Sequence, residues 1–345
     1  MKTSRPLLAL FLAGVIGVAG GCKKKEKDPA GPLGVKIGLV LPDAGDPFYK
    51  AVQAAAQEEA KDPERSFELL VQDAKGKASE QARGVEQLVQ QGANVILVSP
   101  IDVQKLRPAL QKANNAKVYL VMLEASAPDV DVSTTVEFNQ ELVGELCADY
   151  LAQRLKSGGR VGIIGSGKAP GEPQRLQAFK EYLRRKQPSI QVVDEVAADS
   201  EAGQRAAVEN LLKANPNLSA VYTLTDEIAM LATGVIRARA GGGAASGAPF
   251  VVSYGGLPRA VEELQKPGSP LAMTVAALPQ RLGARSARIA WRIAANKPTP
   301  SHVGLPLLPV TKDNYGTFPG WEGQVPASIT IPWTSELELK EKRED

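Results

Sequence analysis

Short apolar runs alternate with amphipathic segments along most of the chain. Residues 35–123 contain four runs rich in Val, Ile and Leu, separated by segments whose apolar residues recur at helical spacing. The four runs are VKIGLVL (35–41), FELLVQDA (67–74), NVILVSP (94–100) and KVYLVML (117–123). Near-continuous apolar runs are typical of parallel strands that helices bury on both faces. The pattern therefore predicts an α/β unit built on a parallel sheet.

The alternation restarts after TTVEFN (134–139). A predicted helix over 139–156 leads to further short apolar runs, each separated from the next by a predicted helix. These runs are RVGIIG (160–165), IQVVDEV (190–196), AVYTL (220–224), FVVSYG (250–255) and LAMTVAA (271–277). The chain is thus predicted to form two doubly wound, Rossmann-like α/β lobes with parallel sheets. Residues 317–345, rich in Pro, Gly and aromatics, are predicted to form an irregular tail with a solvated charged end.

The first residues predict export from the cytoplasm. Lys2 and Arg5 precede an almost wholly apolar run over 6–18, which is shorter than the roughly 18–20 residues that a bilayer-spanning helix needs. The AGGC sequence that follows resembles the cleavage box of bacterial lipoproteins, in which Cys22 becomes the first residue and carries the lipid. Ordinary signal cleavage nearby is the alternative. Residues 22–34 are charged and then rich in Pro and Gly, which predicts a flexible tether.

The composition disfavours several classes of function. Removing residues 1–21 takes two basic residues from a chain with 41 Lys and Arg and 38 Asp and Glu, so the mature surface is nearly neutral and nucleic acid is not an expected partner. Cys147 falls on the apolar side of a predicted helix and is expected to be buried. His302, the single histidine, is predicted to be solvated in a loop and cannot build a zinc site. The sequence predicts no cofactor, no metal site and no enzyme activity.

One glycine-rich stretch resembles a phosphate-binding loop. Residues 162–168 read G-x-x-x-x-G-K directly after an apolar run, as in nucleotide-binding proteins. Such a loop also needs a Ser or Thr hydroxyl after the lysine and a helix that begins there. The chain has Ala169 at that position, and Pro170 and Pro173 delay the helix. We therefore expect a turn that lets backbone approach a ligand, and no ATP binding.

Three motifs, in this order and at these separations, carry a family resemblance. They are DPFY (46–49), GVEQLVQQGANVILVSPID (84–102) and TDEIAMLATGVIRA (225–238). With them the chain, from about residue 35 to 312, resembles a periplasmic binding protein of the ribose-binding type. Such proteins are solute receptors of ABC importers.

The resemblance implies two lobes and a function. The chain would cross between the lobes three times, near 137–139, 277–278 and 304–307. The implied domains are a signal peptide (1–21), a tether (22–34), an N-terminal lobe (35–137 plus 279–304), a C-terminal lobe (138–277 plus 305–316) and the tail (317–345). The protein would be a monomer in the cell envelope, in the periplasm or on the outer face of the membrane, held there by its lipid anchor. It would deliver a small polar, sugar-like ligand to an ABC permease. The alternative is a sensory receptor that signals to a membrane kinase or chemoreceptor.

The resemblance also implies a set of ligand-binding residues at strand ends. Compared with the ribose-type pattern, Asp46 replaces an amide, Thr225 replaces an Asn, Gly255 replaces an Asp and Ala277 replaces a Gln. Ala125 replaces an arginine, and Ser200 replaces an aromatic residue of the second lobe. The polar set is therefore altered, which disfavours a plain pentose or hexose pocket. The predicted ligand-binding residues are Asp46, Phe48, Tyr49, Glu124, Arg175, Thr225 and Tyr254.

Four of these residues have a structural alternative. Phe48 and Tyr49 fit core positions of the first helix, and Glu124 fits a solvated strand end. Arg175 fits an ion pair with a neighbouring acid such as Glu172 on the helix surface. Outside this set, Asp226 is expected to cap its own helix, because Asp is favoured in the first helical turn.

Overall fold

The computed structural model describes residues 34–339, apart from 168, 170, 242–246, 322, 324–328 and 338. The predicted signal peptide, Cys22, nearly all of the tether, and Lys168 with Pro170 of the glycine-rich stretch lie outside the described residues.

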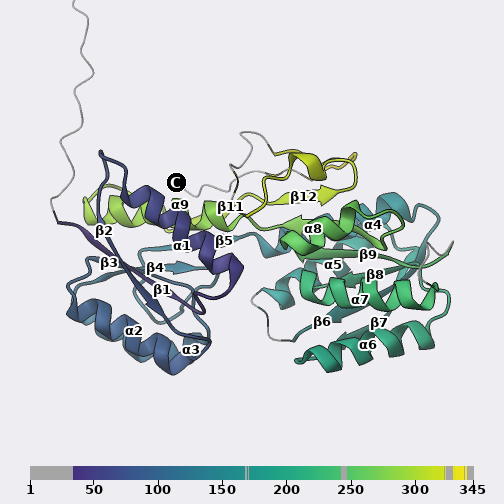
Figure 1. The fold of residues 1–345 in the computed structure, drawn as a ribbon, viewed down its shortest axis with the longest axis horizontal. Helices are drawn as coiled ribbons and strands as arrows, with labels where there is room; N and C mark the ends of the chain where they lie inside the picture. The colour runs from purple at the N-terminus through teal and green to yellow at the C-terminus, as the bar shows by residue number, and fades with distance from the viewer. Residues whose placement is uncertain are drawn as a thin grey trace, which may run out of the picture. The chain divides into compact units, whose positions relative to one another are not determined.

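The first sheet has six parallel strands in the order β11-β5-β4-β3-β1-β2 (Figure 1). Helices α2 and α3 cover one face and α1 and α9 the other. The strands are β1 (Lys36–Leu41), β2 (Glu68–Asp73), β3 (Val95–Val98), β4 (Tyr119–Leu123), β5 (Thr134–Phe138) and β11 (His302–Leu305). The helices are α1 (Pro47–Ala60), α2 (Ala78–Gln90), α3 (Val103–Asn115) and α9 (Pro279–Ala294).

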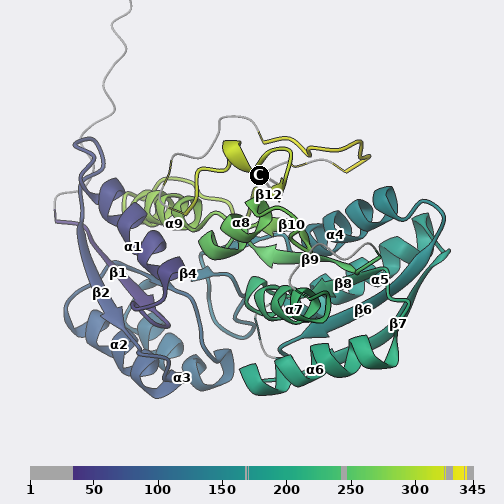
Figure 2. The same cartoon turned by 45° about the vertical axis from the view of Figure 1, so that its right-hand side comes forward.

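The second sheet also has six strands, in the order β12-β10-β9-β8-β6-β7. Helices α4 and α5 pack on one face, and α6, α7 and α8 pack on the other (Figure 2). The strands are β6 (Gly159–Gly165), β7 (Ile190–Ala197), β8 (Ala220–Thr223), β9 (Phe250–Gly255), β10 (Leu271–Ala276) and β12 (Leu308–Thr311). The helices are α4 (Gln140–Arg154), α5 (Glu172–Lys186), α6 (Glu201–Ala214), α7 (Asp226–Arg239), α8 (Pro258–Gln265) and the short 3₁₀ helix η1 (Tyr315–Thr317).

The predicted fold class is confirmed, with two local differences. Strand β12 runs antiparallel to β10, because the chain enters the second sheet directly from β11 without a helical crossover. His302 is the first residue of β11 rather than a loop residue, and its Nε2 lies 3.6 Å from a carboxylate oxygen of Glu137. The predicted loop position was wrong, because pairing of β11 with β5 could not be inferred from a stretch flanked by prolines, but the side chain is partly exposed as expected.

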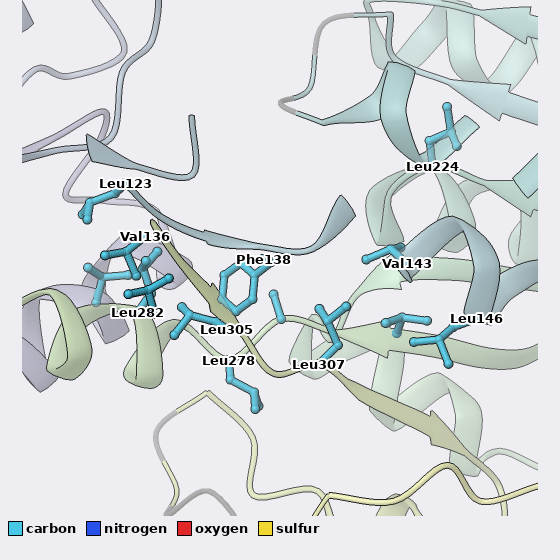
Figure 3. Packing of buried hydrophobic residues seen from close by; sticks show 14 of the residues in the cluster. Leu123, Val136, Phe138, Val143, Leu146, Leu224, Leu278, Leu282, Leu305 and Leu307 are labelled. Carbon is cyan, nitrogen blue, oxygen red and sulfur yellow. The ribbon is translucent and has the colours of Figure 1, made fainter. Parts of the chain in front are cut away.

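The chain passes between the two sheets three times: from β5 to α4, from β10 to α9, and from β11 to β12. Buried apolar side chains fill the crossing region, as Figure 3 shows. Phe138, Leu278 and Leu307 are fully buried there, and Leu305 is nearly so. The three crossings therefore run through a continuous apolar cluster that contains residues from both sheets.

Candidate functional site

Each sheet with the helices that cover it forms one lobe of the molecule. One cavity of about 580 Å³ is lined by residues of both lobes. The structure brings all seven sequence-predicted ligand-binding residues to this one cavity. They are Asp46, Phe48, Tyr49, Glu124, Arg175, Thr225 and Tyr254. In doubly wound folds, ligands lie beyond the carboxyl ends of parallel strands. The segments that follow β1, β4, β6 and β8 supply six of these residues, and Tyr254 lies near the carboxyl end of β9.

Glu124 follows β4 and is held by two hydroxyl groups of the first lobe. Its Oε2 accepts hydrogen bonds from Ser99 Oγ at 2.8 Å and from Tyr49 Oη at 3.1 Å. Its backbone has a φ of +62°, a conformation that non-glycine residues seldom adopt and that recurs at functional sites. Burial raises the pKa of Glu124. Glu124 is therefore a positioned acid at the cavity wall and not a solvated strand end.

The start of α1 supplies an acid and two aromatic rings. Asp46 is exposed and accepts a hydrogen bond from the backbone N–H of Phe48 at 2.7 Å, which caps the helix. The ring of Phe48 packs edge-on against Tyr49, with 5.2 Å between ring centroids, and also against Phe138 at 6.4 Å. Phe48 and Tyr49 thus join the edge of the core and line the cavity at once, so both interpretations from the sequence apply in part.

Arg175 lies on α5 and is almost fully buried, with 1% of its surface exposed. Its Nη1 donates a hydrogen bond to Gln140 Oε1 at the start of α4, and its guanidinium lies 4.6 Å from the centre of the Tyr254 ring. Helices α4 and α5 pack closely at this point. Gly144 of α4 lies so near to α5 that an added Cβ would be 2.2 Å from the carbonyl oxygen of Arg175. Burial raises the pKa of Tyr254 to about 12, which keeps its hydroxyl protonated.

Glu172 occupies the glycine-rich turn between β6 and α5. It is buried, and its two carboxylate oxygens accept hydrogen bonds from the backbone N–H of Ser166 at 2.9 Å, the Ser166 hydroxyl at 2.9 Å and the backbone N–H of Gly167 at 2.7 Å. A phosphate-binding loop directs such N–H groups at its ligand. Here an internal carboxylate takes the place of that anion, which agrees with the expectation that the turn does not bind ATP.

Asp226 does not cap its own helix, so that expectation was wrong. Its carboxylate accepts from Ser253 Oγ, from Thr274 Oγ1 at 2.8 Å and from the backbone N–H of Leu257 at 2.7 Å. These bonds tie α7 to β9, β10 and the start of α8, and burial raises the Asp226 pKa to about 6. A Cβ at Gly255 would lie 2.9 Å from Asp226 Oδ2, so there is no room at 255 for the aspartate of the ribose-type pattern.

Several cavity residues were missed from the sequence. Gln140 directly follows the first crossing, so its place near the hinge was a usable signal. Glu227 and Arg259 lie in the first turns of α7 and α8, where nothing in the spacing separates a cavity residue from a surface charge. Trp321 lies in the tail, beyond the repeated α/β pattern. The lining thus carries three acids and two arginines, together with four aromatic rings.

The described residues contain no cluster of three or more His, Cys, Asp and Glu side chains that could hold a metal ion. Among the helices of the described part of the chain, none is both long and apolar enough to cross a membrane.

Comparison with known proteins settles the family. A family model described as "Periplasmic binding protein domain" matches residues 37–298. The chain belongs to the periplasmic binding proteins. Membership implies an extracytoplasmic location and makes the protein a binding protein rather than an enzyme.

Curated and solved relatives of this periplasmic binding protein span nearly its whole folded part. The ribose import binding protein of Salmonella typhimurium is 27% identical over 280 residues, which cover 80% of this chain and 90% of that protein. The ribose import binding protein of Bacillus subtilis is 27% identical over 303 residues, covering 87% and 95%. A crystal structure of an ABC transporter solute binding protein from Mycobacterium smegmatis with bound glycerol superposes with a TM-score of 0.70 at 25% identity, covering 82% of this chain and 96% of that one.

Proposed function

We propose that this protein captures a small polar, sugar-like ligand in the cavity between its lobes and delivers it to an ABC-type permease. The observation that carries the proposal is the convergence of all seven predicted residues on one cavity. The names of the relatives support the same class, since two are ribose import binding proteins and a third holds glycerol.

The chemistry of the cavity wall fits a polyhydroxylated ligand. A sugar hydroxyl group can both donate and accept hydrogen bonds. The Glu124 carboxylate can accept from such groups, and the Arg175 guanidinium can donate to them. The rings of Phe48 and Tyr49 offer an apolar surface to the C–H groups of the same ligand. The two lobes thus supply complementary polar groups.

The ligand we propose is not simply ribose. Asp46 is a carboxylate where the ribose-type pattern has an amide, and Gly255 and Ala277 carry no polar side chain. A site built to hydrogen-bond a substrate hydroxyl discriminates strongly against a ligand that leaves those bonds unmade. Exchanging several polar groups therefore changes which pattern of hydroxyl groups is accepted.

A thermal-shift screen tests the proposal. The wild-type protein is melted with D-ribose, D-allose, D-arabinose, D-galactose or myo-inositol, and the hits are titrated by calorimetry. A ligand at 100 times its Kd stabilises the folded protein by about 2.7 kcal/mol. We expect one or more of these probes to raise the melting temperature, and Glu124→Ala to abolish that rise. If none of the five raises it, the proposed function is contradicted.

We also propose that Cys22 carries a lipid and anchors the protein, and that the domains and the monomeric state are those predicted from the sequence. A single acyl chain binds a bilayer only marginally, whereas several chains hold firmly. Changing Cys22→Ser is expected to release the protein into soluble fractions or to leave the precursor unprocessed. Fractionation and the apparent mass on a gel report both results, and normal retention with normal processing of that variant argues against the anchor.

A further inference from the structure

The tail of the chain contacts both lobes through two tryptophans. Trp333 Nε1 donates a hydrogen bond to Asp149 Oδ2 at 2.7 Å, and its ring packs edge-on against Tyr150 of α4 at 5.1 Å between centroids. Trp321 instead lies against Phe48 at the start of α1 and lines the cavity. Both tryptophans lie beyond residue 298, where the match to the family model ends.

Trp321 is fixed in place by the residues around it. Its ring meets Phe48 edge-on, with centroids 5.5 Å apart and an interplanar angle of 87°, and 7% of its surface is exposed. The chain on both sides of it is held by Gln280 of α9, whose Nε2 donates to the carbonyl oxygens of Gly320 at 3.0 Å and Gly323 at 3.1 Å. The indole is therefore a built part of the cavity wall, not a side chain that happens to lie nearby.

The indole N–H of Trp321 has no acceptor among the described residues, although the atom is buried. Buried N–H groups almost always have a hydrogen-bond partner, so an unpaired one at a ligand cavity needs an explanation. Trp333 shows the usual arrangement in the same tail, since its N–H is paired with Asp149. Because Trp321 lines the cavity, an oxygen atom of a bound ligand would supply the missing acceptor.

We propose that Trp321 is a specificity-determining ligand-binding residue contributed by the tail. Its ring forms one aromatic wall with Phe48, and its Nε1–H donates to a hydroxyl or ring oxygen of the ligand. This inference rests on the proposed function and narrows its ligand class. A donor at this position favours a sugar or polyol with an apolar face and an exposed oxygen, and disfavours an ammonium group, which can only donate.

The test compares two conservative variants with the wild-type protein. Trp321→Phe keeps an aromatic ring and loses the N–H, whereas Trp333→Phe makes the same change away from the cavity. The probe is whichever of D-ribose, D-allose, D-arabinose, D-galactose and myo-inositol stabilises the wild-type protein most. Affinity is measured by calorimetry and the ligand response by intrinsic tryptophan fluorescence.

We expect Trp321→Phe to bind the probe about 3- to 10-fold more weakly, the effect of one lost hydrogen bond. The ligand-induced change in fluorescence should disappear in Trp321→Phe and persist in Trp333→Phe. Trp333→Phe should lower the melting temperature and leave affinity within about twofold, since a single exchange at a site distant from the ligand leaves its contacts intact.

The possible failures are distinguishable. If a probe binds wild type and Trp321→Phe with equal affinity, or if the fluorescence response survives in Trp321→Phe, this inference is overturned while the proposed function stands. If no probe stabilises the wild-type protein, the proposed function fails and this inference falls with it.

Discussion

Arg175 lies in a nearly closed environment, where neighbouring groups take the place of water around its side chain. Gln140 accepts one of its hydrogen bonds, and the electron-rich face of Tyr254 lies beside its guanidinium. The sequence left open whether Arg175 would be solvated in a cleft or paired on the helix surface. The structure shows a third arrangement, in which the side chain is buried beside α5 and also lines the cavity.

Arg175→Ala is therefore expected to lower both affinity and stability. Hydrogen bonds to a charged group contribute roughly 1.5–3 kcal/mol, so binding of the screened sugar should weaken about 10- to 150-fold. Loss of the packed side chain should lower the free energy of unfolding by about 2–3 kcal/mol. Calorimetry and urea unfolding measure the two effects. The control is Arg184→Ala, which removes an exposed arginine from the same helix. Unaltered affinity with reduced stability would show that Arg175 has only a structural role.

Asp226 gives the fold a pH dependence of its own. Burial raises its pKa from 3.8 to about 6, although three donors favour the charged form. The folded protein therefore binds the proton more tightly than the unfolded chain does. The stability that Asp226 contributes is fully present below pH 3.8 and is lost as the pH rises through about 6.

We predict that Asp226→Asn removes this dependence. Between pH 4 and pH 7 the free energy of unfolding of the wild-type protein should fall, relative to that of the variant, by about 2 kcal/mol, since each pKa unit corresponds to about 1.4 kcal/mol and the unfolded carboxyl is already partly ionised at pH 4. Denaturant unfolding at a series of pH values measures the difference. Asp131→Asn, at an exposed loop position, is the matched control. Parallel curves for wild type and Asp226→Asn are the result that contradicts the prediction.

At the scale of elements, the connection from β6 to α5 shows how one motif can mislead when its surroundings are unknown. The spacing of the glycines is that of a phosphate-binding turn. Its backbone N–H groups, however, donate hydrogen bonds to the carboxylate of Glu172, the first residue of the helix that follows. Glu172 thereby fixes the start of α5, and with it the helix that carries Arg175 into the cavity wall.

Glu172→Gln tests that interpretation. The amide keeps the shape of the carboxylate but replaces one acceptor with a donor that faces an N–H group, so the free energy of unfolding should fall by about 1–3 kcal/mol. The control is Glu181→Gln on the exposed side of the same helix. Neither protein should bind MgATP in equilibrium dialysis. Tight nucleotide binding by the wild-type protein would mean that the turn does act on phosphate.

The sequence could predict the strands and helices because the pattern of apolar residues in each one indicates which of its faces is buried. It could also predict the seven cavity residues, since the resemblance fixed which strand ends meet. It could not predict Trp321, whose position depends on how an irregular tail folds back to Gln280. Nor could it predict the bonds of Asp226, because Ser253 and Thr274 come close only after β9 and β10 pair.

At the scale of the whole molecule, three chain crossings between two sheets make a hinge, and a ligand that touches both lobes favours the closed arrangement. We predict that the screened sugar makes the particle more compact. Small-angle scattering should show a smaller radius of gyration at saturating ligand. The Arg175→Ala protein at the same sugar concentration should show a smaller change, because less of it is occupied by the sugar. An identical profile for wild type with and without bound sugar would contradict closure by the hinge.

The three crossings also determine the order in which the molecule can fold. Strand β11 and helix α9 complete the first lobe. Beside them, Thr134 Oγ1 donates a hydrogen bond to the carbonyl oxygen of Pro300, 166 residues further along the chain. A nascent chain that ends before residue 279 contains β1 to β5 but lacks the helix that covers the face beside α1. Contacts of such long sequence separation slow folding and leave apolar surface exposed meanwhile. We therefore expect the N-terminal lobe to keep apolar surface exposed during synthesis until residues 279–305 have been made.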